Sequence, residues 1–406
     1  EGLEALRPPV SIEILGARAS VDVAAGVDLI ADADVVISAK ANSAETFSVS
    51  SSFGFGLGYA RSTSEASVAI GAGASIDAGG SVQLVSLTDN TIELGVESSV
   101  RIDELPVIVA FAISDAHSHA STTVAAGATI HAATGDVHAL ANNTNSVKTS
   151  ADSSGTYALV AVGVVFSWSD ATADAIVDGE VTADQGDVVV MAQTASAQDE
   201  IGANAKIGTG FMDKVKSRLS KFDLVDQAKS KANDAVVGPI TNWLAAKVGE
   251  NTLLGKFIKG EGDSKKAAQS FKGFGGSLTV GVGVHNNAAT VRLGGTADVS
   301  AEGDVAVRAA VFDQPVIASN TEVMPGWNAE AKKGARNTPK QFAGAISVAF
   351  GYYGNAATAT IGAGAEVDAG GTIDVAADAL LPNAFPLDLV KLPVELAMSE
   401  DRIGLL

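Results

Sequence analysis

Histidine and aspartate side chains carry the first candidate chemistry of this chain. The stretch SDAHSHAS places Asp115, His117 and His119 at alternate positions, so in an extended strand all three side chains point to one face. Two imidazoles and a carboxylate are ligands that Zn²⁺ accepts. His131 and His138 follow in the next run of the chain. Equivalent stretches elsewhere read SDATADA, HNNAATV and YGNAATA. We therefore expect a generic polar strand face without bound metal, and keep the first three residues as the metal candidates.

Aspartates near predicted corners suggest a second chemistry, calcium binding. The calcium-binding nonapeptide repeats G-G-x-G-x-D every nine residues, whereas GAGASIDAGG has neither that order nor that period. An aspartate at such a corner commonly caps its own turn. We expect that capping role and no cofactor, with structural calcium as the alternative. The aspartates concerned are Asp77, Asp136, Asp187, Asp304 and Asp368.

Catalytic motifs are the third class of chemistry. The chain has no cysteine, which excludes disulfides, thiolate metal sites and cysteine nucleophiles. It also contains no G-x-S-x-G, H-E-x-x-H or P-loop pattern, the common motifs of hydrolases, zinc proteases and nucleotide-binding enzymes. A polysaccharide lyase or epimerase would need carboxylates, Lys or Arg, and aromatic side chains in one groove. The predicted strands are poor in Lys, Arg and Trp, so we expect no enzyme and keep this class as an alternative.

The charge of the chain limits its partners. It has 47 Asp and Glu against 27 Lys and Arg, a formal net charge of −20, which repels nucleic acid phosphates. The sequence shows no signal peptide and no apolar stretch long enough to span a membrane, and it starts in mid-pattern. We expect an interior or processed piece of a longer polypeptide, whose further segments would be among its partners.

A repeat positions these residues. The frame I-G-A-G-A-x-x-D-A-G-G occurs at residues 70–80 and again at residues 361–371. Alternating apolar and polar residues mark strands with one buried face, and the Gly-Gly and Gly-Asp pairs mark corners. One unit takes about 50 residues, which indicates a solenoid, propeller or array. Each unit has one alternating run before its corner and a second one after it. These second runs begin near Val35, Val82, Val137, Val188, Val305 and Ile373.

Variable spacing between units favours a solenoid, because each coil contacts only its neighbours and tolerates insertions at its corners. We predict an all-β fold, a parallel β-helix (β-solenoid) that is expected to be right-handed, with a mainly α-helical insertion. A coil of about 20–25 residues would put two coils in each unit, stacked at roughly 4.8 Å. The chain would then form a rod of about fourteen coils and ~70 Å.

The corner-and-strand pattern G-D-V-x-V-x-A and the V-x-V-G-V run before a polar stretch resemble the passenger regions of large secreted bacterial adhesins. These are the filamentous haemagglutinin-like and autotransporter-like β-solenoids. The resemblance covers most of the chain outside two interruptions. It implies a rod that displays or spans, an extracellular location on the bacterial cell surface or in secreted form, and no catalytic residues.

Two interruptions break the repeat. The first has apolar residues at helical spacings of three and four, and residues 206–272 hold 13 of the 27 Lys and Arg but 7 of the 47 Asp and Glu. We expect this basic helical insertion to pack on the acidic solenoid. Contact with a neighbouring molecule is the first alternative and membrane-surface binding the second. The interaction candidates of both interruptions are Phe211, Leu219, Phe222, Trp243 and Trp327.

The predicted layout follows from the repeat and its interruptions. Solenoid repeats occupy 1–208, 273–321 and 342–380, the basic helical insertion 209–272, a loop or helical insertion 322–341, and a linker or cap 381–406. The predicted function is a structural segment of a large secreted bacterial surface protein, acting as adhesin stalk or extracellular fibre. A self-assembling matrix or surface-layer polymer subunit is the alternative. Predicted partners are copies of the chain or neighbouring cell-surface and matrix components, without nucleic acid and without membrane contact.

Overall fold

The structure is a computed structural model that describes residues 10–52, 54–99, 107–155, 160–208, 274–324 and 342–381. Within these ranges the regular structure consists of strands. Each range is one coil, built from a long strand, a four-residue strand and, after a second corner, another long strand. The described part of the chain is therefore a parallel β-solenoid of stacked coils, as the alternating sequence pattern predicts.

Eighteen strands form three sheets, which we call A, B and C. Sheet A contains the first long strands, β1 (Val10–Val23), β4 (Phe55–Ile70), β7 (Val107–Val124), β10 (Val160–Val177), β13 (Phe274–Leu293) and β16 (Phe342–Ile361). Sheet B contains the short strands, β2 (Asp28–Ala31), β5 (Ser75–Ala78), β8 (Thr129–Ala132), β11 (Glu180–Ala183), β14 (Asp298–Ala301) and β17 (Glu366–Ala369). Sheet C contains the second long strands, β3 (Val35–Ser51), β6 (Val82–Ser99), β9 (Val137–Gly155), β12 (Val188–Gly208), β15 (Val305–Met324) and β18 (Ile373–Leu380).

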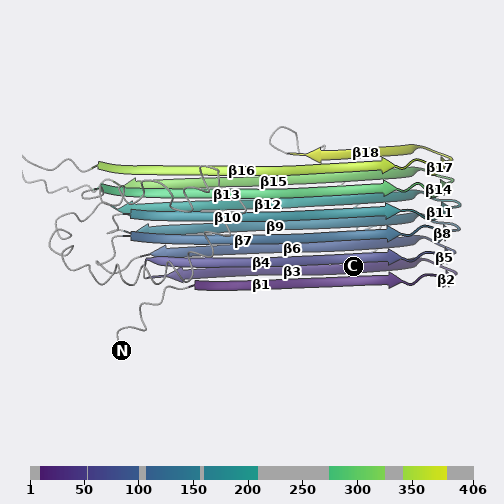
Figure 1. Ribbon diagram of the computed structural model, residues 1–406, viewed down its shortest axis with the longest axis horizontal. Helices are drawn as coiled ribbons and strands as arrows, with labels where there is room; N and C mark the ends of the chain where they lie inside the picture. Colours follow the sequence, from purple (N-terminus) through teal and green to yellow (C-terminus); the bar gives the residue numbers. More distant parts are fainter. Residues whose placement is uncertain are drawn as a thin grey trace, which may run out of the picture.

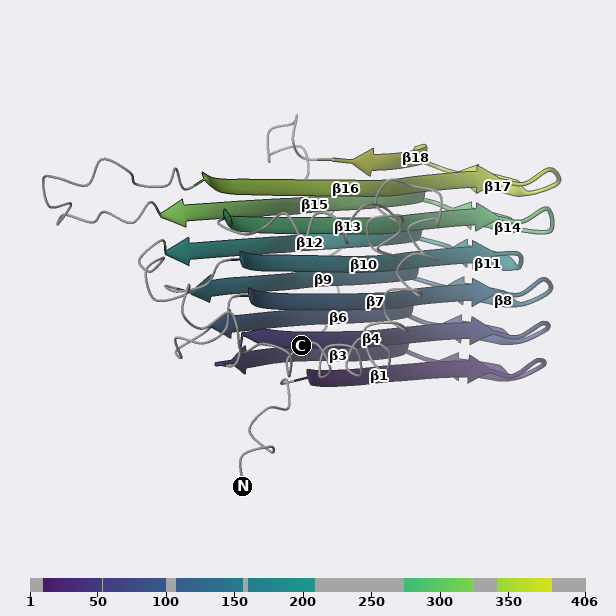
Figure 2. The same cartoon turned by 60° about the vertical axis from the view of Figure 1, so that its left-hand side comes forward.

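All neighbouring strands within a sheet are parallel, and each strand pairs with the strand three places away in sequence. Sheets A and C lie face to face with their strands running in opposite directions, and sheet B closes one end of every coil (Figures 1 and 2). Because the chain returns through the same three sheets, residues about 50 positions apart in sequence become vertical neighbours.

The register explains why the sequence repeats itself. The first residue of each sheet C strand lies directly above its equivalent in the previous coil, which confirms the six predicted run starts from Val35 to Ile373. A column of alanines crosses sheet A in the same way. Small side chains suit this column because the two long sheets pack closely across a thin interior. Its members are Ala19, Ala66, Ala120, Ala173, Ala289 and Ala357.

The predicted coil length is wrong. One repeat unit is one coil and not two, because the polar stretches SDATADA (169–175) and HNNAAT (285–290) lie inside β10 and β13 and do not end them. Six coils at about 4.8 Å give ~29 Å along the stacking axis, whereas a strand of 20 residues such as β13 spans about 65 Å. The described body is a plate whose longest axis follows its strands (Figure 1), and not the predicted rod.

At the corner between sheets B and C, aspartates bind the next coil. Asp34 Oδ1 accepts a hydrogen bond from the backbone N–H of Ser81 at 2.8 Å, and Asp187 Oδ1 accepts one from Asp304 N at 2.8 Å. The expectation that corner aspartates cap their own turns is therefore corrected for this corner. The same bond links Asp136 to Asp187 N and Asp304 to Thr372 N.

The predicted helical insertion (209–272) lies outside the described residues, as do almost all of the second interruption and of the C-terminal segment. β12 ends at Gly208 and β13 begins at Phe274, and these two strands belong to successive coils of one stack. Within the described ranges, no helix has the length and apolar character needed to cross a membrane.

Candidate metal centre

A polar layer crosses the interior between two apolar clusters. The larger apolar cluster lies beside sheet B and the second lies farther along the long strands. Between them, inward-facing hydroxyl and amide side chains bond across the two sheets. Asn145 Nδ2 donates to Ser169 Oγ at 2.5 Å, and Asn143 Nδ2 donates to the carbonyl of Ser118 at 2.9 Å. The amide nitrogens of both residues have partners in the facing sheet, which offsets part of the cost of their burial, whereas their amide oxygens have no hydrogen-bond partner among the described residues.

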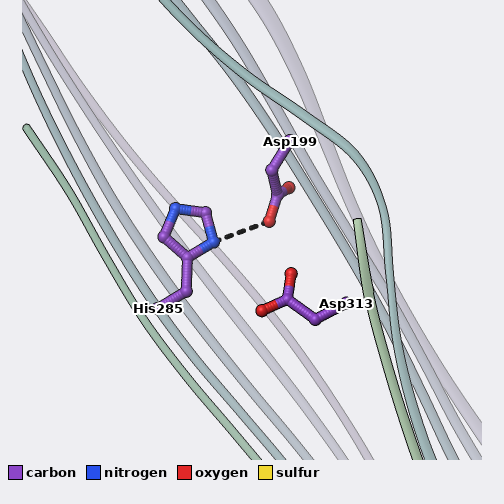
Figure 3. A group of neighbouring side chains, drawn as sticks. All are labelled: Asp199, His285 and Asp313. Atoms are coloured by element: carbon purple, nitrogen blue, oxygen red, sulfur yellow. Dashed lines mark ion pairs between the residues drawn. The ribbon is translucent and has the colours of Figure 1, made fainter. Parts of the chain in front are cut away.

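In the fourth and fifth coils this layer contains ionisable side chains. Asp199 of β12, His285 of β13 and Asp313 of β15 are each 0% exposed. We call them the Asp–His–Asp cluster. His285 Nδ1 lies 2.7 Å from Asp199 Oδ2, and one ligand atom from each residue lies within 4.8 Å of the other two. Both carboxylates point toward the imidazole from the facing sheet (Figure 3).

A β-bulge places Asp199. β12 has one extra residue relative to β15 between Ser196 and Asp199, where the register shifts. Such a bulge locally re-aims a side chain, and here it turns the Asp199 carboxylate toward sheet A (Figure 3). Asp199 Oδ1 accepts a hydrogen bond from Val147 N at 2.7 Å, and Oδ2 accepts one from the Ser196 hydroxyl. The carboxylate is therefore fixed by two neighbours in its own sheet.

The neighbouring coil supports Asp313 and His285. Asn355 Nδ2 donates to Asp313 Oδ2 at 3.1 Å, and the His285 ring meets the Tyr353 ring edge-on with centroids 5.4 Å apart. Burial raises the pKa of the Asp313 carboxyl, an effect that the neighbouring His285 and the Asn355 hydrogen bond oppose. Burial, followed by the charges of Asp313 and Asp199, raises the pKa of Tyr353 to about 12.

Several polar atoms of the cluster are left without a hydrogen bond. His285 Nε2 and Asp313 Oδ1 are buried and have no hydrogen-bond partner among the described residues. His285 Nδ1 is close to Asp199 Oδ2, but the two groups are not aligned as a hydrogen bond. An unpaired buried polar group costs about 1–3 kcal/mol, and a further partner between His285 Nδ1 and Asp313 Oδ1 would offset this cost.

The metal candidates from the sequence lie on β7, on the outer face of sheet A. His117 Nε2 lies 2.9 Å from Asp115 Oδ1, and its Nδ1 lies 3.3 Å from Asp170 Oδ2 in the next coil. Hydrogen bonds to Asp115 and then Asp170 raise the pKa of His117 to about 9. His119 Nδ1 instead meets Thr172 Oγ1 at 2.6 Å. The structure thus brings Asp115 and His117 together as part of a bridge between coils, and the expectation that they hold no metal stays untested.

The corner aspartate Asp77 contacts a histidine and not its own turn. His131 lies between Asp77 Oδ1 at 2.7 Å and Asp184 Oδ2 at 3.0 Å, which joins three successive coils across sheet B. His138 Nε2 lies 3.9 Å from Asp136 Oδ2. Calcium binding at the corners stays untested. The interaction candidates Phe211, Leu219, Phe222, Trp243 and Trp327 all lie outside the described residues.

The Asp–His–Asp cluster is not among the sites predicted from the sequence. HNNAATV has the composition of a generic polar stretch, although His285 shares its alternation phase with Ala289 and Leu293, which are buried. Asp313 likewise continues the buried phase of Val307 and Val311. The sequence signal for this cluster is an ionisable residue at a position that alternation assigns to the buried face of its strand. The approach of β12, β13 and β15 was not visible in the sequence.

A separate open groove of about 430 Å³ crosses the outer face of sheet C. Glu93, Lys148 and Glu200 line it, and Phe47 is the aromatic residue among its described lining residues. The base of the groove is formed by small side chains that belong to one register column. This column contains Ser48, Gly95, Ser150, Gly202 and Ala318.

Comparisons of the chain with protein-family models, with curated proteins and with solved structures found no match. The function must therefore be argued from the described geometry.

Proposed function

We propose that this chain is a structural module, a run of coils within a longer β-solenoid that serves as an adhesin stalk or extracellular fibre. The proposal rests on one observation: the core residues of the last described coil are exposed at the end of the stack. Ile361 and Ile373 belong to inward-facing columns but are 38% and 47% exposed. Their equivalents one coil earlier, Leu293 and Val305, are 0% exposed. A further coil would bury these side chains as the internal coils bury theirs.

Both ends of the described stack support this proposal. β1 and β16 are the outermost strands of sheet A, so each presents one edge without a strand partner among the described residues. A finished solenoid needs an end coil with a polar outer surface, because an exposed strand edge pairs readily with another chain. The columns at both ends continue the internal pattern, with Ala19 at one end and Ala357 at the other. Continuation by coils of the same design fits this geometry.

The location and the handedness are further parts of the proposal. We place the module outside a bacterial cell, because the absence of cysteine fits an exported protein and its G-D-V-x-V-x-A corners and V-x-V-G-V run resemble secreted adhesin solenoids. A right-handed coil is proposed from the general preference of parallel crossover connections. No catalytic role is proposed.

The test compares association of the chain with that of a variant whose open end is charged. Ile373→Lys should suppress end-to-end association, whereas Gln185→Lys should not, since Gln185 is exposed at the corner between β11 and β12 in an internal coil. Light scattering and electron microscopy over a wide concentration series measure the effect. Limited end-to-end pairs of the unmodified chain would support a segment of a longer solenoid. Long ordered filaments would favour the polymer subunit. A chain that stays monomeric, with Ile373→Lys unchanged in stability, would refute the open-end argument.

A further inference from the structure

We propose that the Asp–His–Asp cluster binds one divalent transition-metal ion of the zinc class inside the solenoid. The three ligands come from both long sheets, with Asp199 and Asp313 on adjacent strands of sheet C and His285 on sheet A. An ion at their centre would join β12, β13 and β15 in one coordination sphere. This inference rests on the cluster and is independent of the proposed structural function.

The separations suit a single ion. Bonds from zinc to imidazole nitrogen or carboxylate oxygen are about 2.0–2.2 Å, so ligand atoms around one ion lie ~3–4 Å apart. The three ligand atoms already lie within 4.8 Å of one another. His285 Nδ1 and Asp199 Oδ2 are 2.7 Å apart and would separate slightly around an ion, while Asp313 would approach, both through side-chain rotation. Three protein ligands leave a coordination position that a water molecule would complete.

Charge balance also favours a divalent cation. Metal ligands bind in their deprotonated form, in which the two carboxylates and the imidazole together carry a charge of −2, and an ion of charge +2 neutralises the set. Without a cation the interior must hold either buried negative charge or additional protons, and burying an unpaired charge is costly. The mixed donor set selects among metals, since imidazole suits zinc and other transition metals whereas calcium and magnesium prefer oxygen ligands throughout.

Neighbouring groups leave the required atoms available. Asp199 is held by Val147 N and the Ser196 hydroxyl, and Asp313 is held through Oδ2 by Asn355. Such outer partners orient the ligands of a metal site. Asp313 Oδ1 and His285 Nδ1, the ring nitrogen that faces the two carboxylates (Figure 3), remain without hydrogen bonds although the side chains are fully buried. These two atoms are the independent sign that the cluster lacks a partner.

The position of the cluster gives the ion a structural role. β12 ends at Gly208 and β13 begins at Phe274, so 65 residues of sequence separate the coil that supplies Asp199 from the coil that supplies His285. Bringing together strands that are far apart in sequence has an entropic cost, which contacts between the two coils offset. An ion coordinated by both Asp199 and His285 would link the two coils directly.

The experiment measures zinc binding by the full chain after chelation, using metal analysis and calorimetric titration with Zn²⁺ alone. We expect one equivalent per chain, a higher melting temperature with zinc, and a visible absorption spectrum of a low-symmetry site when Co²⁺ replaces it. His285→Asn and Asp313→Asn should each weaken binding by ~100-fold or more, because each removes a ligand. His119→Asn is the matched control, since His119 lies on the outer face and contacts Thr172.

Asp313→Asn keeps the shape of the side chain, so it tests the site even if His285→Asn fails to fold, which circular dichroism would show. A folded chain that binds no zinc would overturn the proposal and favour a cluster held by shared protons. Stoichiometric binding that survives both cluster variants, or that is lost in His119→Asn, would also overturn it by placing the ion elsewhere.

Discussion

Replacing Gly79 by alanine should separate two coils at the corner between sheets B and C. A Cβ at Gly79 would lie 2.3 Å from the carbonyl oxygen of Asp32 and 2.8 Å from its carbonyl carbon. Both atoms are backbone, so no side chain can rotate away. An ordinary contact between carbon and oxygen needs about 3.3 Å, and the corners must therefore move apart by ~1 Å. Gly79 is not among the glycines with positive φ, so the effect isolates the steric contact.

The magnitude follows from the bonds that hold this corner. Gly79 N donates to the carbonyl of Ala31 at 2.8 Å, and Ser81 N donates to Asp34 Oδ1 at 2.8 Å. A displacement of ~1 Å would take both beyond hydrogen-bonding distance. Each contributes about 0.5–1.5 kcal/mol, more where the acceptor is charged. We expect Gly79→Ala to lower the free energy of unfolding by about 2–3 kcal/mol.

The matched control is Gly95→Ala within β6. A Cβ there would lie 3.6 Å from Ser150 Oγ, an ordinary contact, and alanine reduces the flexibility of the unfolded chain. We expect this variant to gain about 0.5–1 kcal/mol. Urea unfolding followed by circular dichroism measures both variants, and amide exchange at Ser81 reports the corner itself. Equal stability of the two variants, or unchanged protection of Ser81 in Gly79→Ala, would refute the steric argument.

Two further predictions concern charged contacts between coils. Asp187→Ala removes the acceptor of the Asp304 N–H and should cost about 1–2 kcal/mol in urea unfolding, whereas Asp187→Asn keeps Oδ1 and should cost less than half as much. Equal losses would show that the charge matters and not the hydrogen bond. The pKa of His117 is raised to about 9 in the folded chain by Asp115 and Asp170, so its contribution to stability is complete below pH 6.5 and disappears as the pH rises through about 9. Because the side chain is 29% exposed, we expect the loss to stay below about 3 kcal/mol and to be absent in His117→Asn. Parallel pH dependence of the two proteins between pH 6.5 and 9.5 would refute this assignment.

Local patterns in the sequence suffice to predict the all-β solenoid and the places where its sheet C strands begin. Strand alternation and corner glycines are local properties, since adjacent side chains in a strand point to opposite faces whatever the rest of the chain does. The pattern G-D-V marks one corner for three reasons that the structure supplies. Gly186 approaches the backbone of the coil below, Asp187 accepts the next coil's N–H, and Val188 starts the inward column.

The coil length depends on contacts between parts of the chain that are far apart in sequence. The polar stretch SDATADA separates two apolar runs in sequence, yet β10 continues through it, and Ser169 accepts a hydrogen bond from Asn145 of the facing sheet. A polar side chain can be buried when a partner across the interior satisfies it, and that partner lies 24 residues away in sequence. For this reason the described coils form a thin plate with two facing sheets and not the predicted rod.

The Asp–His–Asp cluster also depended on the tertiary structure. The alternation phase alone places His285 and Asp313 on the buried face, but their meeting with Asp199 requires the pairing of β12 with β15, a bulge in β12 and the return of the chain at β13. Those three conditions join residues 86 and 114 positions from Asp199 in sequence. Local patterning determines which face a side chain occupies, whereas the stacking of distant coils determines which charges share an interior.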